Sequence, residues 1–478
     1  MSASRFSIPD FCRRADDACA RPRTVLAVIL VWSLILLAAQ LLKHYAFESN
    51  AFDLRLHEEL VRNTWHGKFM YSDLAGSSFL PYHVSLIFPV LALLYPLWPG
   101  PVWLLVIQGA LVAGAAWFLW GFARDAALRP LVAFSVVVTF LTYDGLLNGY
   151  FQGFHQEVIA VFFLLGFFRA VQRRRAPAAF VFALFALFCR EDFALPLAVF
   201  GAMLACRRES RGLGVAVCAL CVGWLVAVYA WVIPQHSASG QVAEVSRWAR
   251  YGTTYGGIVC GLLAHPFEVL GHLVRGTVDP LARLFYLPVL DPWTLLPALL
   301  PLTVHTSSSF RLEAHLGAAY ATLFVPFFFT GLVRTLARPW FRRRLSRDRV
   351  ALAGCLLLVL VNLQAPPHPK TLAGAREAHR GLARINADLA GRRVLAQGSI
   401  LPHLGWPLEY AMIGARQAKP PDHYDLILLG ETLNPWPLQA KDIAALKARL
   451  LKSGSWEATT SGSITCFRKK TLAGAEVP

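Results

Sequence analysis

The stretch FDLRLHEELVRNTWHGKFMYSDLAGSSFLPYH, residues Phe52 to His83, decides the fold of this chain. It is polar and aromatic, and strongly apolar segments lie on both sides of it. Its ionisable residues include an aspartate, a pair of glutamates and three histidines: Asp53, Glu58, Glu59, His57, His66 and His83. A simple connection needs about five residues, so a loop this long and this rich in ionisable groups is expected to be functional or partly helical.

The composition is that of a polytopic membrane protein. Of 478 residues, 56% are hydrophobic and only 16% are charged, which is too apolar for a soluble globule. The formal net charge is +17, but the arginines come in short clusters between apolar runs, without interleaved aromatic residues. We therefore interpret these clusters as topology signals and expect no nucleic-acid partner. The nine cysteines lie mostly in apolar runs, where they are expected to pack as small core residues.

The N-terminal sequence sets the orientation of the chain. Residues 1 to 23 are polar and basic, and they precede Val25 to Leu42, an uncharged run long enough to cross a bilayer. No small-residue cleavage site follows, which predicts a retained first helix with a cytoplasmic N-terminus. The loop of residues 43 to 83 is then external.

The segment from Val84 to Trp98 decides the rest of the topology. It is apolar, but Pro89 and Pro96 interrupt it and it is too short to span, so we expect a helix at the outer interface. If this segment does not cross the membrane, every arginine cluster lies on the cytoplasmic side and every cluster of Asp, Glu and His lies on the external side. The same count predicts about ten crossings, a second external loop over residues 234 to 275, and a re-entrant hairpin in the proline-broken run from Leu281 to Val304.

The composition changes near residue 366, where helical and strand patterns begin to alternate. This predicts a small external α/β domain over residues 366 to 478, after an all-α polytopic membrane domain over residues 24 to 365. His403 and Glu431 are polar residues at predicted strand ends. Because no glycine fingerprint accompanies them, we expect a docking or recognition role for this domain in place of cofactor binding.

Ionisable residues from four segments converge on the predicted external side. They are Asp53 with His57 and Glu58, then His83, then His155 with Glu157, and finally Arg190, Glu191 and Asp192. Ionisable residues at span ends mark candidate sites, although each one can also be an interfacial anchor or a helix cap. Such groups suit attack on an activated sugar, ligation of a divalent cation that neutralises a phosphate, or proton coupling in a carrier. Their spacing leaves these three tasks open.

Several short motifs recur in the order of a known family. They are Phe52-Asp53, Asn63-Thr64-x-x-Gly67, His83-x-Ser85, Phe154-His155, Arg190-Glu191-Asp192 and His315. From about Asp53 to Asp425 the chain resembles the bacterial family called domain of unknown function 2079. The layout of that family is similar to that of the GT-C superfamily of glycosyltransferases, which use sugars linked to polyprenyl phosphate.

The resemblance implies an essential acidic residue in the first external loop, the place of Asp53, and a second acidic or metal-linked position at His155 or Glu157. It implies a glycosyltransferase on the outer face of the bacterial inner membrane, with a polyprenyl-phosphate sugar donor. Asp53 would be the base, and His155, Glu157 and Arg190 would bind phosphate, directly or through a divalent cation. The other substrate-binding candidates are His57, His83, Glu191 and Asp192.

Two other functions remain open. A carrier or flippase for a lipid-linked substrate predicts charges deep within spans and internal repeats, and the sequence shows neither. A non-catalytic membrane scaffold predicts that the C-terminal domain alone binds a partner and that Asp53 can be replaced freely.

Overall fold

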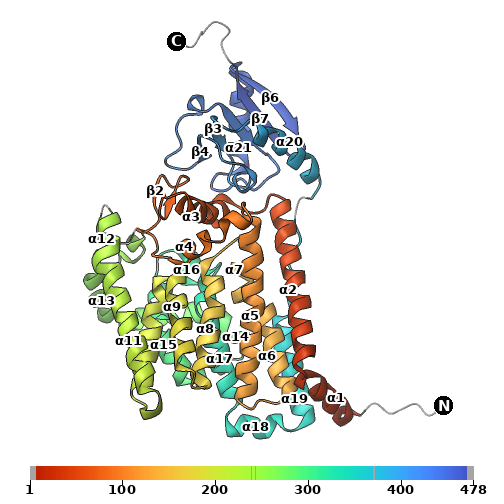
Figure 1. Ribbon diagram of the computed structural model, residues 1–478, viewed down its shortest axis with the longest axis vertical. Helices are drawn as coiled ribbons and strands as arrows, with labels where there is room; N and C mark the ends of the chain where they lie inside the picture. The colour runs from red at the N-terminus through yellow and green to blue at the C-terminus, as the bar shows by residue number, and fades with distance from the viewer. Residues whose placement is uncertain (1–6, 238, 243, 370–371, 471–478) are drawn as a thin grey trace, which may run out of the picture. The chain divides into compact units, whose positions relative to one another are not determined.

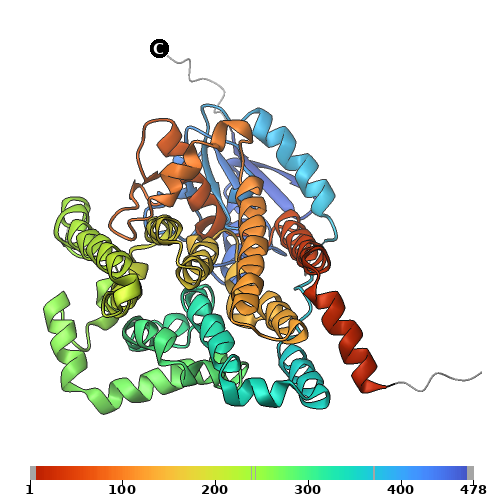
Figure 2. The ribbon, with the colours of Figure 1, turned by 60° about the horizontal axis from the view of Figure 1, so that its bottom comes forward.

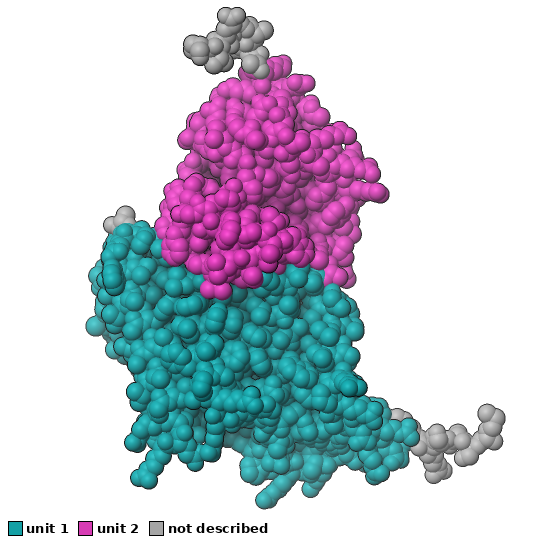
Figure 3. Space-filling model, viewed as in Figure 1, with its two compact units in different colours: residues 1–37, 80–87, 106–366 teal, residues 38–79, 88–105, 367–478 magenta. Residues whose placement is uncertain are grey.

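The computed structural model describes residues 7–237, 239–242, 244–369 and 372–470. The chain is mostly helical, with a small sheet near its C-terminus (Figure 1). It divides into two compact units (Figure 3). Unit 1 consists of residues 1–37, 80–87 and 106–366, and unit 2 of residues 38–79, 88–105 and 367–478. The stretch from Phe52 to His83 therefore contributes to both units.

Three helical stretches of the described chain are long and apolar enough to cross a membrane. They are α2 (Pro22–Tyr45), α5 (Val102–Asp125) and the stretch Arg208–His236, which includes α11 (Arg211–Val226) and α12 (Ile233–His236). Two bent pairs raise the number to as many as five: α6 (Pro130–Thr142) with α7 (Asp144–Tyr150), and α13 (Tyr255–Ala264) with α14 (Pro266–Ala282). The prediction of about ten crossings is not confirmed, because other predicted spans are shorter than the roughly 20 residues that a bilayer requires.

The remaining helices of unit 1 are short. They are α1 (Ile8–Ala20), α8 (Gln156–Gln172), α9 (Ala176–Cys189), α10 (Ala194–Ala205), α15 (Pro292–Thr306), α16 (Arg311–Ala314), α17 (Val325–Leu336), α18 (Pro339–Leu345) and α19 (Asp348–Asn362). Figure 2 shows them from nearer their ends. The re-entrant hairpin predicted for Leu281 to Val304 stays a prediction: this run begins at the end of α14 and holds the 3-10 turn Leu287–Leu290 and the helix α15, which packs against α14. Pro297 and Pro301 lie inside α15, as neighbouring groups in a membrane protein allow.

Unit 1 has apolar residues on its surface and closely packed helices in its interior. Val31 and Leu34 of α2 are 59% and 63% exposed, as expected where lipid replaces water. Inside, α10 packs against α11 at glycines. A Cβ added at Gly201 would lie 2.9 Å from the backbone nitrogen of Cys218, and one at Gly214 would clash with the backbone of Ala205. Small residues let membrane helices approach this closely.

The first part of unit 2 confirms that the stretch after Phe52 is partly helical. A π-helical turn (Ala51–Arg55) leads into α3 (Leu56–Trp65), followed by a hairpin of β1 (Tyr71–Ser72) and β2 (Ser77–Ser78). The side chain of Asn50 starts the turn by accepting hydrogen bonds from the backbone N–H groups of Phe52 and Asp53, at 2.9 and 3.0 Å. The segment predicted as an interfacial helix forms α4 (Ile87–Ala92) and the 3-10 turn Tyr95–Leu97.

The C-terminal part of unit 2 is a small α/β fold, as predicted. Its sheet has the order β4-β3-β5-β7-β6, where β3 pairs in parallel with β4 and β5, and β7 pairs antiparallel with β5 and β6. The elements are α20 (Ala375–Ala387), β3 (Arg393–Ala396), β4 (Glu409–Met412), β5 (Leu426–Leu429), α21 (Ala440–Lys452), β6 (Trp456–Ser461) and β7 (Ile464–Lys469). All four residues of β5 are buried, which explains its continuous apolar sequence. The sequence prediction missed β4.

Candidate functional site

The turn between α9 and α10 carries the centre of the site. The α-helix ends at Cys189, Arg190 is extended, and a 3-10 turn (Glu191–Phe193) begins α10. The Arg190 guanidinium forms ion pairs with Glu157 and with Asp192, the latter at 2.5 Å. The side chains of Arg190 and Glu157 are only 7% and 6% exposed, whereas that of Asp192 is 25% exposed. Arg190 therefore holds one deeply buried carboxylate and one that is more accessible.

His83 joins this centre through Glu191. The two side chains lie 2.8 Å apart, from Nδ1 to Oε1, and the backbone N–H of Val84 donates to the other carboxylate oxygen at 3.0 Å. Burial and Arg190 both act to lower the pKa of His83, but Glu191 and Asp192 outweigh them and raise it. The pairing with Glu191 thus favours the protonated form of His83.

A buried glutamine places His155 in the same cluster. Gln108 of α5 donates to the carbonyl oxygens of Tyr150 and Gly153, at 3.2 and 2.9 Å, and accepts from the backbone N–H of His155 at 2.9 Å. The His155 ring then lies 3.8 Å from Glu157. Unit 1 consequently brings together six of the predicted site residues: His83, His155, Glu157, Arg190, Glu191 and Asp192.

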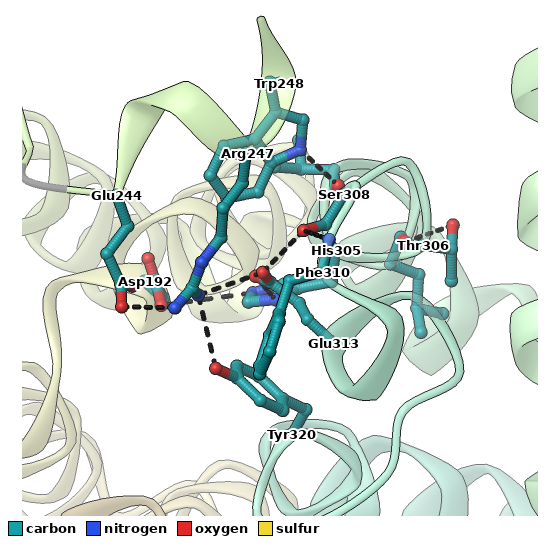
Figure 4. A network of polar contacts seen from close by, with 12 residues as sticks. Asp192, Glu244, Arg247, Trp248, His305, Thr306, Ser308, Phe310, Glu313 and Tyr320 are labelled. Carbon is teal, nitrogen blue, oxygen red and sulfur yellow. Dashed lines mark hydrogen bonds and ion pairs between the residues drawn. The ribbon is translucent and has the colours of Figure 1, made fainter. Parts of the chain in front are cut away.

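A second polar network, which the sequence prediction missed, adjoins the first (Figure 4). His305 at the end of α15 contacts Glu313 of α16 at 2.7 Å. Arg247 lies 3.1 Å from the same carboxylate and donates to the Tyr320 hydroxyl at 3.2 Å. His305 also lies 4.0 Å from Asp192, so it connects the two networks.

Asp192 and Glu313, one carboxylate from each network, are held in their ionised form. Burial alone would raise the pKa of Asp192, but Arg190, His305 and His83 outweigh it and lower that pKa. Burial likewise opposes ionisation of Glu313, and His305, Ser308 and Arg247 lower its pKa. Both groups are therefore hydrogen-bond acceptors at neutral pH.

Residues of both networks line a cavity of about 230 Å³. The charged and histidine residues of the lining are His83, Arg190, Glu191, Asp192, Glu244, His305 and Glu313. The aromatic and aliphatic residues include Tyr229, Trp248, Tyr255, Ile258, Val259 and Leu262. Carboxylates outnumber arginines four to one in this lining. The cavity can therefore accept hydrogen bonds from a neutral polar group while an apolar face of that group packs on the apolar part of the lining.

The structure places Asp53 and His57 in unit 2. The Asp53 carboxylate accepts a hydrogen bond from the Asn50 amide, and the His57 ring contacts the Asp53 carbonyl at 3.2 Å and stacks on Phe88. A site shared between Asp53 and the cluster in unit 1 stays a prediction. Glu58 is buried and lies 3.3 Å from Arg55, and burial raises its pKa to about 7.

Arg55 is the main polar link inside unit 2. It donates to the carbonyl oxygens of Leu404 and Gly405 at 2.8 and 2.9 Å, and its guanidinium lies 3.5 Å from the centre of the Trp406 ring. His403, beside them, is half-buried and stacks on His44 with 4.2 Å between ring centres. Glu431 is a surface residue that pairs with Lys447 at 3.3 Å. The turn holding His403 thus packs on the first loop, while Glu431 remains on the surface.

No metal centre is evident in the described part of the chain. Within it, no group of three or more His, Cys, Asp or Glu side chains is arranged to hold a metal ion. The residues present therefore do not form a protein-made site for the divalent cation that the resemblance allows, and the steps proposed below do not use one.

The fold and this site define a helical membrane protein with a buried charged cluster beside a partly apolar cavity. The chain belongs to the family described as predicted membrane protein (DUF2079), whose model matches residues 43–462. This confirms the family resemblance seen in the sequence motifs. Among curated proteins, none matches the chain.

Proposed function

We propose that this protein is a membrane glycosyltransferase that takes a sugar from a polyprenyl-phosphate donor at the outer face of the bacterial inner membrane. The cavity beside Arg190 carries this proposal, because its lining combines four carboxylates with aromatic and aliphatic side chains. A sugar has hydroxyl groups that donate to carboxylates and C–H faces that pack on aromatic rings. The same sugar is the group that a polyprenyl-phosphate donor would deliver.

The charges of the cavity support a sugar more strongly than a phosphate. Arg190 is already engaged by Glu157 and Asp192, so a phosphate would have to compete with two carboxylates for it. At about 4 Å, two like charges repel by about 4 kcal/mol at an effective dielectric constant of about 20. We therefore assign Arg190 a positioning role, which keeps Asp192 ionised and directed at the cavity. Direct phosphate contact by His155, Glu157 or Arg190 stays a prediction.

The proposed reaction is an inverting displacement. Asp53 takes the proton from the acceptor hydroxyl, and the oxygen of that hydroxyl attacks the anomeric carbon of the sugar. The bond between that carbon and the phosphate oxygen breaks, and its electron pair leaves with the polyprenyl phosphate. The role of Asp53 rests on the family resemblance, whereas sugar binding is proposed from the lining of the cavity in unit 1.

The test compares three variants in intact cells of a strain that lacks the native protein. Asp53→Asn removes the base, and Asp192→Asn removes a sugar acceptor from the cavity. Asp17→Asn, on the exposed face of α1, is the matched control. Glycan and lipid products that require this protein should disappear with the first two variants and persist with the control. Unchanged products with Asp53→Asn would refute the assignment of the base.

A direct measurement separates the enzyme from a carrier. Purified protein in liposomes should form a new glycosidic bond when it receives both a lipid-linked sugar and an acceptor. Movement of the lipid-linked sugar across the bilayer without any covalent product would instead support the carrier function.

A further inference from the structure

Unit 1 contains a second and larger cavity, of about 740 Å³, formed by residues that take no part in the site described above. Its lining comes from α5, α8, α9, α10, α11, α15 and α17 and from the turns that follow α8 and α10. The charged residues in the lining are Arg174, Arg207, Arg208, Arg334 and Glu209. The apolar ones include Phe122, Phe168, Phe200, Leu204 and Trp293. The cavity therefore combines an apolar surface with four arginines and a single carboxylate.

Two of the four arginines already have acidic partners. Arg334 lies 2.9 Å from Asp291, and Arg174 lies 2.5 Å from Glu209. The other two, Arg207 and Arg208, have no carboxylate within ion-pair distance among the residues that the structure describes. The guanidinium of Arg207 stacks on Trp293, 3.6 Å from the ring centre. This contact orients the guanidinium and leaves its N–H groups in the ring plane available as donors.

The position of this cavity fits the depth of lipid headgroups. Arg174 lies in the turn between α8 and α9, and Arg207 and Arg208 lie in the turn between α10 and α11. These turns connect apolar helices, and the positive-inside tendency places such arginine clusters on the cytoplasmic side. Basic pockets between membrane helices on this side bind phosphate headgroups. Tryptophan is also enriched at this depth.

We propose that this cavity binds an anionic phospholipid of the cytoplasmic leaflet, with its phosphate at Arg207 and Arg208 and an acyl chain against Phe168, Phe200 and Leu204. Arginine donates two parallel hydrogen bonds to a phosphate and is the side chain best shaped for it. The charge count also distinguishes the two cavities. The smaller cavity has four carboxylates and one arginine, whereas the larger has one carboxylate and four arginines. Only the larger one suits an anion.

The test measures phosphatidylglycerol binding to the detergent-purified full chain by native mass spectrometry. The variant Arg207→Gln with Arg208→Gln removes both unpartnered charges. The matched control, Arg13→Gln with Arg14→Gln, removes two charges from the exposed surface of α1. The first variant should bind about 30-fold more weakly than the native chain, since each arginine near anionic headgroups contributes about 1 kcal/mol and about 1.4 kcal/mol corresponds to a factor of ten. The control should bind like the native chain.

Two further probes identify the source of the phosphate and keep the proposal refutable. Phosphatidylcholine, which has no net charge, should show no difference between the variants. Inorganic phosphate should not displace phosphatidylglycerol, because it lacks the acyl chain. Displacement by inorganic phosphate would show a site for free phosphate and overturn the lipid assignment. Equal phosphatidylglycerol binding by both double variants would overturn the site itself. Arg207→Lys with Arg208→Lys, which keeps the charges, should restore most of the binding if the loss is electrostatic.

Discussion

Replacing Arg190 by alanine should destabilise the protein strongly, because it leaves Glu157 buried without its partner. The Glu157 side chain is only 6% exposed and lies in the first turn of α8. Removing one member of a buried ion pair costs about 3 to 5 kcal/mol, since the remaining charge loses both water and its counter-charge. Asp192 should contribute less to this penalty, because its side chain is 25% exposed and His305 lies 4.0 Å away.

A second substitution tests whether the unpaired charge is the cause. Glu157→Gln in the Arg190→Ala background removes the isolated carboxylate, so this double variant should be more stable than Arg190→Ala alone. The measurement is the thermal midpoint of detergent-purified protein, followed by tryptophan fluorescence. Arg173→Ala is the control, because the Arg173 side chain is 41% exposed and a surface pair contributes only about 0 to 1 kcal/mol. A double variant no more stable than Arg190→Ala would refute the reasoning.

Three further outcomes follow from single contacts. The folded pKa of His83 is raised, so its pair with Glu191 should stabilise the protein fully below about pH 6.5, the ordinary histidine value. This contribution should be lost as the pH rises through the raised pKa. Thermal midpoints of the native chain should therefore fall between about pH 6 and pH 9, and His83→Gln should flatten that dependence. Gly214→Val should destabilise the folded protein by about 1 to 3 kcal/mol, because a Cβ there would clash with the backbone of Ala205. The control is Gly212→Val, where a Cβ meets open space. Equal thermal midpoints for the two variants would contradict the close packing. Arg55→Met should loosen the turn at Leu404 and Gly405, because it removes two hydrogen bonds. The backbone amides of these two residues should then exchange their hydrogens faster. Unchanged exchange rates would show that other contacts hold the turn.

The sequence predicts element types well where the pattern is local. The α/β character of the C-terminal domain follows from alternating helical and strand patterns, and four of its five strands, β3, β5, β6 and β7, are recognisable from such a pattern. The fifth, β4, has only four residues and follows a polar turn, so its pattern alone is too short to distinguish from a loop. The number of spans could not be obtained in the same way, because apolar helices of 12 to 17 residues satisfy a hydropathy pattern without the length of a bilayer.

The candidate site was predicted in part for a different reason. His83 and Glu191 are 108 residues apart in the chain. Their proximity was expected only because the distribution of charged residues placed both on the external side of the membrane. His305 and Glu313 lie in a stretch that the same argument placed outside, and Arg247 lies in the second long external loop. What the sequence could not provide is the register of these segments, which tertiary packing sets. A rule that treated every charged residue on that side as a candidate would have included all three.

The opposite charges of the two cavities constrain how a lipid-linked donor can meet this protein. Four carboxylates line the smaller cavity, and each would repel a phosphate brought within about 4 Å by about 4 kcal/mol at an effective dielectric constant of about 20. A donor that enters sugar first, with its phosphate kept at the opening of the cavity, would avoid this repulsion. This orientation leaves the anomeric carbon at the boundary between the cavity and its mouth. In the proposed reaction an acceptor hydroxyl would approach that carbon from the same side, so the cavity lining need not supply the base.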